Sequence, residues 1–502
     1  YIDAVWYYLA HKTFKFCTKV QISERKSKEN DFFLMHFLRD VIPTKSKLHF
    51  NYLVGDILRE KRCIFVAKMK QQAMSIIELY DIYCEHPVVT TDSRKCLDGS
   101  IFFALKGASF DGNQYALQAL EKGCAFAVVD NPEIAKQDKR LLLVDDVLTS
   151  LQDLAAYHRK IWGKTVLQIT GTNGKTTTKE LISAVLSETK NVLFTEGNLN
   201  NHIGVPLTLL RIKPEHDIAV IETGANHPGE IAALSNIVQA DMGLITNVGR
   251  AHLEGFGSFE GVKQTKGELY DSLHQRGKKI FLNTSDEDLL QMALGRGFVL
   301  GKDALPYIEG VVDAVTPFVE MKWRSADSNS WRTTLTNLVG SYNIANLRAA
   351  VTIGLHFGIT LEQIDHALSA YYPTNSRSEL RVIGSNRLIV DAYNANPSSM
   401  AAALTNFSLM NDEHKMVILG DMRELGAESI EEHKKVVEQL QGMKLERIWL
   451  VGSEFKKVAE GLRVFADVDA VKVALRQEPV SDMTILIKGS NGTKLHQIPD
   501  FF

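Results

Sequence analysis

The residues between Gly171 and Thr177 have the types and the spacing that bind phosphate. They follow a short apolar run, residues 166–169, and precede a helical pattern over residues 175–186. In such a turn, backbone N–H groups converge on an anion and the helix dipole strengthens the attraction. Lys175 would bring a positive charge to the outer phosphates of a nucleotide, and Thr176 would offer a hydroxyl to Mg²⁺.

This loop is a shorter variant of the usual phosphate-binding pattern. That pattern has two glycines separated by four residues before Lys-Ser/Thr, and Ile169 stands where the first glycine would be. The alternative is an ordinary turn between a strand and a helix, but both flanking elements favour phosphate. The motif alone predicts nucleotide binding and specifies no reaction.

Two later segments offer candidate metal ligands. Residues 218–222 predict a buried strand that ends in Glu222. A carboxylate at this position is well placed to bind Mg²⁺. The alternative, a carboxylate that is merely solvated at a strand end, is less favoured because Thr176 offers a second ligand. His252 lies in Gly249–Gly257, where three glycines bring the backbone close to a neighbour. A lone histidine in a loop is more often only hydrogen-bonded, so His252 needs support from other residues.

Further polar residues are open to two interpretations. An asparagine cluster between residues 195 and 206 predicts turns, or neutral partners for an amide-rich substrate. Asn343 is either a helix cap or a nucleotide contact. Lys266 lies on a predicted helix with Lys263 and Glu268, where a solvated charged face is the default. The asparagines of the cluster are Asn198, Asn200 and Asn201.

Length and composition define the class of protein. The 502 residues predict two to four domains, and 45% hydrophobic with 23% charged residues is typical of a globular protein. A net charge of −3 gives no argument for nucleic acid. The sequence contains no uncharged apolar run of about 18 residues or more, so it predicts no membrane span. None of the five cysteines forms a C-x-x-C pair, which favours free thiols in the cytoplasm.

Residues 1–73 differ from the rest of the chain. They carry 14 Lys and Arg against 7 Asp and Glu, without the order of a signal peptide or a sustained period. We expect Met74 to be the natural start and this segment to be a non-native or disordered upstream extension. The alternative is a small helical domain with helices over residues 32–40 and 52–61.

The remaining chain predicts three α/β domains. Residues 74–160 form a small unit whose strand-end loops carry Ser93, Arg94 and Lys106, where cations beside open glycine backbone suit a diphosphate. Solvated surface charges are the alternative for these residues. Residues 161–371 hold the phosphate loop on a parallel sheet, with antiparallel strands appended over about residues 310–340.

Residues 372–502 alternate strands with helices, which predicts a mostly parallel, Rossmann-like sheet. Ligand sites in such sheets lie beyond the carboxyl ends of the strands. The loops expected there are Asp391–Pro397, Gly420–Gly426 and Lys488–Gly492. Asp391 and Arg377 could contact a nucleotide from this side, and an interdomain salt bridge is the alternative for Arg377.

The order of these motifs points to a known family. Along the chain they are the Thr170–Thr177 loop, Glu222, His252, Asn343, Arg377 and Asp391. This set resembles the Mur ligase family, ATP-dependent ligases of peptidoglycan precursor synthesis, over about residues 74–497. Other segments resemble the branch that adds D-alanyl-D-alanine, and the Asp-Asp/Asn-Pro-Arg motif of the branch adding diaminopimelate or lysine is absent. Those segments are Gly197–Pro206, Gly224–Glu230, Ala251–Gly257, Asp391–Pro397 and Gly420–Gly426.

The resemblance implies the three-domain Mur ligase architecture in a monomer, and a two-step reaction through an acyl phosphate. The carboxylate of a UDP-N-acetylmuramoyl-tripeptide is activated by ATP and then attacked by the amine of D-alanyl-D-alanine. Lys175, Glu222, His252 and Lys266 would be catalytic, and Lys266 aligns with a lysine that is carbamylated in the family. Mg²⁺ would bind Thr176, Glu222 and His252.

The resemblance also assigns binding residues. ATP would contact Gly171, Thr172, Asn173, Gly174, Lys175, Thr176, Thr177, Asn343, Arg377 and Asp391. The substrates would contact Ser93, Arg94 and Lys106 at the diphosphate, Asn198, Asn200 and Asn201 at the peptide, and Tyr393, Asn394 and Asn396 at the dipeptide. The alternatives are another Mur-type or a folylpolyglutamate-synthase-like ligase, and a nucleotide-dependent binding module without catalysis.

Overall fold

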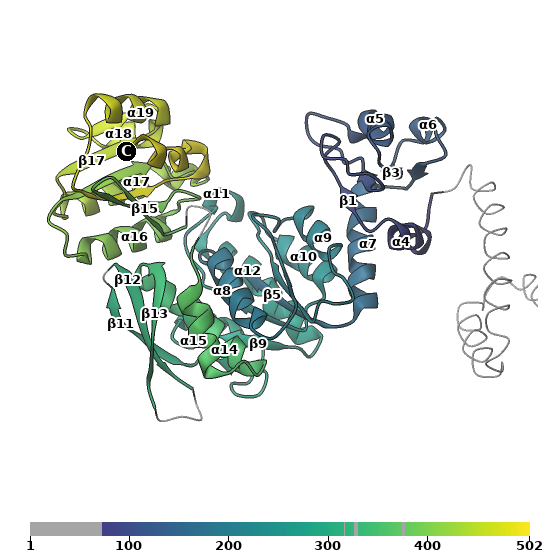
Figure 1. The fold of residues 1–502 in the computed structure, drawn as a ribbon, viewed down its shortest axis with the longest axis horizontal. Helices are drawn as coiled ribbons and strands as arrows, with labels where there is room; N and C mark the ends of the chain where they lie inside the picture. Colours follow the sequence, from purple (N-terminus) through teal and green to yellow (C-terminus); the bar gives the residue numbers. More distant parts are fainter. Residues whose placement is uncertain (1–72, 316, 326–329, 374–376) are drawn as a thin grey trace, which may run out of the picture. The chain divides into compact units, whose positions relative to one another are not determined.

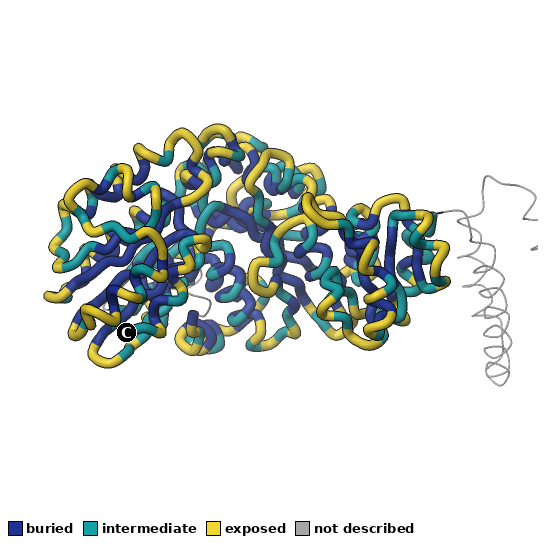
Figure 2. Tube along the Cα trace, turned by 90° about the horizontal axis from the view of Figure 1, so that it is seen from above, coloured by how far each residue is buried: buried dark blue, intermediate teal, exposed yellow. Residues whose placement is uncertain are grey.

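The computed structural model describes residues 73–315, 317–325, 330–373 and 377–502, and residues 73–502 form one compact unit. The expectations for residues 1–72 lie outside the described residues. Figure 1 shows the arrangement of the elements, and Figure 2 shows that buried stretches of the chain run through the interior while exposed stretches lie at the periphery. Within the described residues, no helix combines the length and the apolar character needed to cross a bilayer.

The N-terminal lobe is built on a parallel sheet in the order β1-β2-β3-β4. The helix Ile76–Glu85 of this lobe has a defined start, because Ser75 and Glu78 form a reciprocal capping box at its N-terminus. The strands are β1 (Val89–Thr90), β2 (Ile101–Phe103), β3 (Phe126–Val129) and β4 (Leu141–Leu143), and the helices are α4 (Ile76–Glu85), the 3-10 helix Gly112–Tyr115, α5 (Ala116–Glu121), α6 (Pro132–Ala135) and α7 (Val147–Trp162).

The central lobe contains a parallel sheet in the order β10-β9-β8-β5-β7-β6. In its middle, β5 pairs with β7 so that Ile169 lies opposite Glu222. The register therefore puts Glu222 beside the start of the phosphate loop. The strands are β5 (Thr165–Thr170), β6 (Val192–Phe194), β7 (Ile218–Glu222), β8 (Met242–Ile245), β9 (Lys279–Leu282) and β10 (Ala304–Pro306).

Helices cover both faces of this sheet because successive side chains of a strand point to opposite faces. Val166 packs with α10 and α12 on one face, whereas Leu167 packs with α8 and α14 on the other. The helices are α8 (Lys175–Ser187), α9 (Gly204–Leu209), α10 (Glu230–Val238), α11 (Leu253–Phe256), α12 (Phe259–Gln275), α13 (Glu287–Leu294), the 3-10 helix Ser341–Asn343, α14 (Ile344–His356) and α15 (Leu361–Ala370).

The appended antiparallel strands are present as predicted. They are β11 (Glu309–Val315), β12 (Phe318–Arg324) and β13 (Arg332–Val339), paired in that order. Trp323 is fully buried between this sheet and the helices, and its indole N–H donates to the hydroxyl of Thr334 at 2.9 Å. That hydrogen bond satisfies the only polar atom of the indole, as burial of a tryptophan requires.

The C-terminal lobe has a sheet in the order β14-β15-β19-β16-β17-β18, in which only β14 pairs antiparallel with its neighbour. The predicted three-domain α/β architecture with a Rossmann-like C-terminal sheet is thus confirmed. The strands are β14 (Glu379–Ile383), β15 (Asn386–Asp391), β16 (Lys415–Gly420), β17 (Arg447–Val451), β18 (Arg463–Phe465) and β19 (Thr484–Lys488).

Helices lie on both faces of this sheet as well. Residues of α16, α17 and α18 pack on one face, and residues of α19 and the chain's last turns pack on the other. The helices are α16 (Pro397–Leu409), the 3-10 helix Gly426–Glu428, α17 (Ser429–Gln441), α18 (Ser453–Val458), α19 (Val468–Gln477) and the 3-10 helices Asn491–Thr493, Leu495–Gln497 and Pro499–Phe501.

A buried arginine joins α7 to the central sheet. Arg159 is 6% exposed and donates to the carboxylate of Asp241 at 2.7 Å and to the carbonyl of Val238 at 3.3 Å. Asp241 also accepts from the backbone N–H of Val166 at 3.1 Å. The ammonium of Lys278 donates to the other oxygen of Asp241 at 2.8 Å, so two cations compensate this carboxylate, of which Arg159 is the buried one.

We expect Arg159→Met to lower the free energy of unfolding by about 2 kcal/mol, because it removes a buried charge-assisted hydrogen bond while Lys278 still compensates Asp241. Calorimetric melting of the full chain would measure the change. Arg140→Met is the matched control, since Arg140 pairs with Asp138 at 2.7 Å but is 43% exposed. Its cost should stay below about 1 kcal/mol, and equal losses in both variants would contradict the argument.

Candidate functional site

A cavity of about 760 Å³ brings together most of the residues that the sequence predicts to be functional. Its wall is formed by the phosphate loop, the asparagine-rich loop, the end of β7, the start of α14, the loop at the carboxyl end of β15 and the last residue of β19. The predicted residues that line it are Thr172, Asn173, Gly174, Lys175, Thr176, Thr177, Asn198, Asn200, Asn201, Glu222, His252, Asn343, Arg377, Asp391, Tyr393, Asn394 and Asn396.

Two glycines shape the phosphate loop. Gly171 has a φ of 144°, and a Cβ there would lie 2.0 Å from the hydroxyl of Thr246. Gly174 has a φ of 74° and directly precedes α8, where a Cβ would lie 2.7 Å from Asn346. Both positions therefore require glycine, and the N-terminus of α8 is left without a side-chain cap, as an anion-binding site needs.

Lys175 folds over its own loop. Its ammonium donates to the carbonyls of Gly171 at 2.8 Å and Thr172 at 2.9 Å. Burial lowers the pKa of Lys175 to about 8, although the nearby carboxylate of Glu222 acts in the opposite direction. Arg377 adds a repulsive charge that lowers the pKa further. Lys175 is therefore a poorly solvated cation that an anionic ligand would stabilise.

Glu222 and Thr176 form the centre of a candidate metal site. The hydroxyl of Thr176 donates to one oxygen of Glu222 at 2.9 Å, and the amide of Asn200 donates to the other at 2.8 Å. Among the described residues, no three His, Cys, Asp or Glu side chains gather into a metal-binding group. A hydroxyl and one carboxylate nevertheless fit Mg²⁺, which completes its octahedron with waters and phosphate oxygens.

His252 reaches the same cavity from the loop before α11. It has a left-handed backbone with a φ of 52°. Its Nδ1 forms an ion pair with the carboxylate of Glu424, which comes from the C-terminal lobe. Burial lowers the pKa of His252, while Glu424 opposes that change.

Lys266 does not lie on a solvated face. It is 2% exposed, its ammonium donates to the carbonyl of Ala225 at 3.3 Å, and it lies 5.2 Å from the ring centre of Phe256. Burial and repulsion from Lys175 lower the pKa of Lys266 to about 7, against the attraction of two carboxylates. One of these, Glu268, instead accepts from backbone N–H groups at the start of α10.

An asparagine relay supports the loop from α14. Asn343 accepts from the amide of Asn346 at 2.9 Å, and Asn346 accepts from the hydroxyl of Thr178 at 3.0 Å. The side chain of Asn343 makes no capping hydrogen bond, so the helix-cap alternative is not observed. Sequence reasoning missed Asn346, although its position three residues after Asn343, on the same helix face, was a usable signal.

The C-terminal lobe contributes a second group of lining residues. The guanidinium of Arg377 stacks over the ring of Tyr393 at 3.8 Å. Asp391 pairs with Lys488 at 2.5 Å, and Lys488 is 2% exposed. The amide of Asn396 donates to the side chain of Asn173 in the phosphate loop at 2.8 Å. The sequence placed the segment Lys488–Gly492 at the ligand edge of the sheet, but it did not single out Lys488 as a site residue.

Five predicted residues do not line this cavity: Gly171 and Lys266 of the central lobe, and Ser93, Arg94 and Lys106 of the N-terminal lobe. Arg94 pairs with Asp92 and its side chain is 84% exposed, and Lys106 pairs with Asp130 at 2.8 Å. The carbonyl of Ser93 accepts from Lys122 at 2.9 Å. Their role at a diphosphate stays a prediction.

The sheets and the cavity define a phosphate-loop enzyme whose site combines two α/β lobes. Three family models match the chain. They are described as Mur ligase middle domain over residues 169–354, Mur ligase, glutamate ligase domain over 377–491, and Mur ligase family, catalytic domain over 87–159.

Individual proteins agree with these models. The UDP-N-acetylmuramoyl-tripeptide–D-alanyl-D-alanine ligase of Escherichia coli (strain K12) is 36% identical, and that of Bacillus subtilis (strain 168) is 35% identical. Each alignment covers 82% of this chain and 92% of the relative. A crystal structure of MurF from Acinetobacter baumannii superposes with a TM-score of 0.73 at 31% identity, again over 82% and 92% of the two chains. The chain belongs to the Mur ligase family.

The lowered pKa of Lys266 predicts a pH-dependent stability. Its pKa of about 7 when folded lies below the ordinary value near 10.4, so the unfolded chain binds more protons between these pH values. The charged Lys266 therefore disfavours folding most below about pH 7, and the effect is gone by about pH 10.4. We expect Lys266→Met to raise the melting temperature at pH 6, with a gain that vanishes near pH 10.

Lys263→Met is the control on the same helix. An ion pair with Asp288 raises the pKa of Lys263, so removing Lys263 should lower the melting temperature slightly at pH 6. A gain of Lys266→Met that does not depend on pH would contradict the charge argument and point to packing alone.

Proposed function

We propose that this protein is an ATP-dependent ligase that joins D-alanyl-D-alanine to UDP-N-acetylmuramoyl-tripeptide. The observation that carries the proposal is one cavity lined by Lys175, Thr176, Glu222 and His252 together with Tyr393 and Asn394 of the C-terminal lobe. A nucleotide, an acid and an amine can meet there. The identity to D-alanyl-D-alanine ligases over most of both chains supports these substrates.

The first step transfers a phosphoryl group between two anions. The terminal carboxylate of the tripeptide attacks the γ-phosphorus of ATP, the bond to the bridging oxygen breaks, and ADP and an acyl phosphate result. The repulsion between carboxylate and triphosphate must be offset where charge develops, which is the role of Lys175 and the backbone N–H groups of the loop. Bound Mg²⁺ would supply further positive charge to the phosphate oxygens.

The second step forms the amide bond. The neutral amine of D-alanyl-D-alanine attacks the carbonyl carbon of the acyl phosphate, a tetrahedral intermediate forms, and phosphate leaves as the amine loses a proton. Tyr393, Asn394 and Asn396 are suited to position this amine, because they line the cavity from the C-terminal lobe. Holding the two reactants in contact removes most of the entropic cost of the encounter.

Thr176, Glu222 and His252 are the proposed ligands of Mg²⁺, in two sites. Thr176 and Glu222 would hold the first ion, since they already share a hydrogen bond in the cavity wall. His252 would help to hold a second. The loop residues from Gly171 to Thr177, with Asn343, Arg377 and Asp391, are the proposed ATP contacts. Asn198, Asn200 and Asn201 are the proposed contacts of the peptide.

Lys266 has the properties of a lysine that reacts with CO₂. With a pKa of about 7, a large fraction of its amine is neutral at physiological pH. That amine can form an N–C bond with CO₂ and lose a proton, which yields a carbamate anion. The anion would relieve the repulsion with Lys175 and could orient a metal ion.

Phosphate release is the direct test of the reaction. The full chain with Mg²⁺ and ATP should release phosphate rapidly only when both UDP-N-acetylmuramoyl-tripeptide and D-alanyl-D-alanine are present, and Lys175→Ala should lower kcat at least about 100-fold. Parallel assays with lysine- and diaminopimelate-containing tripeptides would identify the preferred acid. Release with glutamate and a folate in place of these substrates, or no release with any acid, would contradict the proposal.

Chemical rescue tests the carbamate. We expect Lys266→Ala to lose most activity and to regain part of it with formate or acetate, because a small carboxylate can occupy the space of the lost anion. The same salts should not rescue Lys175→Ala, whose missing group is a cation. Wild-type activity of Lys266→Ala without any added carboxylate would reject the role of Lys266.

A further inference from the structure

The loop Gly420–Gly426, after β16, contacts the candidate metal ligand His252. The carboxylate of Glu424 lies against Nδ1 of His252. The backbone carbonyl of Glu424 also accepts from the N–H of Glu254, two residues further along the His252 loop, at 3.4 Å. This segment of the C-terminal lobe therefore meets the loop of the central lobe through both its backbone and its side chain.

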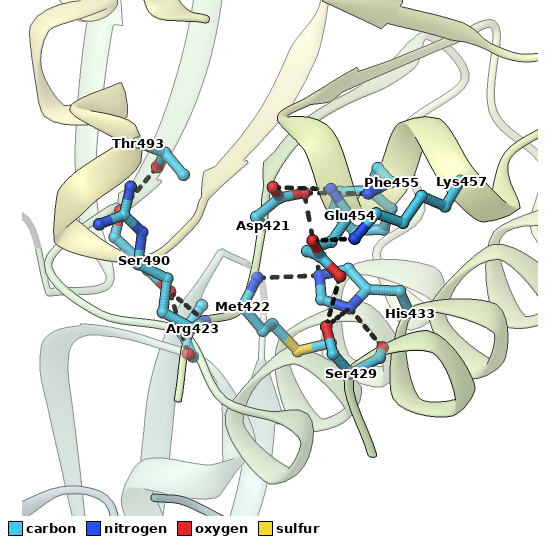
Figure 3. A network of polar contacts seen from close by, with 11 residues as sticks. Asp421, Met422, Arg423, Ser429, His433, Glu454, Phe455, Lys457, Ser490 and Thr493 are labelled. Carbon is cyan, nitrogen blue, oxygen red and sulfur yellow. Dashed lines mark hydrogen bonds and ion pairs between the residues drawn. The ribbon is translucent and has the colours of Figure 1, made fainter. Parts of the chain in front are cut away.

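The base of this loop is held by buried polar groups, which Figure 3 shows together. The N–H of Met422 donates to Nε2 of the fully buried His433 at 3.0 Å, and Nδ1 of His433 donates to the carbonyl of Ser429 at 2.7 Å. Because Nε2 accepts, His433 is the neutral tautomer with its proton on Nδ1. His433 is thus a structural anchor for the loop.

The residues beside Met422 are held as firmly (Figure 3). The carboxylate of Asp421 accepts from the N–H groups of Glu454 and Phe455 at the start of α18, at 3.0 Å each. The N–H of Arg423 donates to the hydroxyl of Ser490 at 3.0 Å. Three consecutive residues before Glu424 are therefore fixed by different elements of the C-terminal lobe.

Glu424 itself has a left-handed backbone with a φ of 63°. This conformation is unfavourable for a residue with a long side chain, and it persists only when the surroundings impose it. The anchored residues before Glu424 supply that constraint. The result is a carboxylate held at the boundary of two lobes and directed at one ring nitrogen of His252.

A carboxylate in this position controls which nitrogen of a histidine can bind a metal. A metal-ligating imidazole commonly donates its second N–H to a carboxylate, which fixes the tautomer and the ring orientation. With Nδ1 of His252 facing Glu424, Nε2 is the nitrogen that keeps a lone pair for a metal ion. We propose that Glu424 is a positioning residue that makes His252 competent for metal when the C-terminal lobe is docked.

This inference rests on the metal role of His252 in the proposed function, and its test uses metal affinity. Electron paramagnetic resonance would measure the affinity of the full chain for Mn²⁺ in the presence of saturating ADP. The relevant site is the one whose affinity falls in His252→Ala. We expect Glu424→Met, which removes the acceptor but keeps the length, to weaken that site about 10-fold or more. Glu424→Gln keeps an acceptor oxygen without the charge, so it should retain most of the affinity.

Glu428→Met is the matched control. Glu428 pairs with Arg250 at 3.2 Å across the same boundary and does not contact His252, so its loss should change Mn²⁺ affinity less than about 2-fold. In a His252→Ala background, Glu424→Met should have no further effect, because the two residues act as one unit.

Three results would overturn the inference: Mn²⁺ affinity of Glu424→Met within about 2-fold of wild type, an effect that persists in the His252→Ala background, or no weakening by His252→Ala itself. Failure of the proposed function is recognised separately. It would appear as an absence of substrate-dependent phosphate release by the wild-type chain, whatever the Mn²⁺ titrations show.

Discussion

The parallel pairing of β5 with β7 is the constraint on which the site depends. In parallel strands the carboxyl ends meet at one edge of the sheet, so the loop after β5 and the last residue of β7 must be neighbours. The register aligns Ile169 with Glu222, which brings Glu222 close enough to the phosphate loop to accept a hydrogen bond from Thr176. A shift by one residue would turn the carboxylate to the other face of the sheet.

The second feature is a pair of poorly solvated lysines, Lys175 and Lys266. Burial lowers the pKa of both lysines well below its ordinary value, and repulsion from Arg377 lowers that of Lys175 further, as repulsion from Lys175 does for Lys266. Such an arrangement costs stability in the absence of a ligand. Bound anions would offset this cost, because a triphosphate and a carboxylate stabilise the charged form of both lysines. Stability and function are therefore in opposition at this site.

The sequence predicted the fold well because its signals are local. Apolar strands such as residues 218–222 can be predicted from their own residues alone. The same is true of a glycine-rich turn before a helix. Other residues acquire their roles through contacts that are not local in the sequence. Lys488 looks like an ordinary strand end until β19 is known to pair with β15, which places it opposite Asp391. The position of Lys266 on a helix with other charged residues favoured a solvated side chain, and only the family resemblance gave it a catalytic role.

The contacts between the central and C-terminal lobes show why the two sheets work as one site. Asn173 of the phosphate loop accepts from Asn396, which is also the N-terminal cap of α16. The backbone N–H of Arg250 donates to the hydroxyl of Ser398 on the same helix at 3.0 Å. One end of α16 thus touches both loops that carry the candidate ligands. A movement of the C-terminal lobe must therefore alter the phosphate loop and the His252 loop together, and hence the positions of nucleotide and metal relative to the amine.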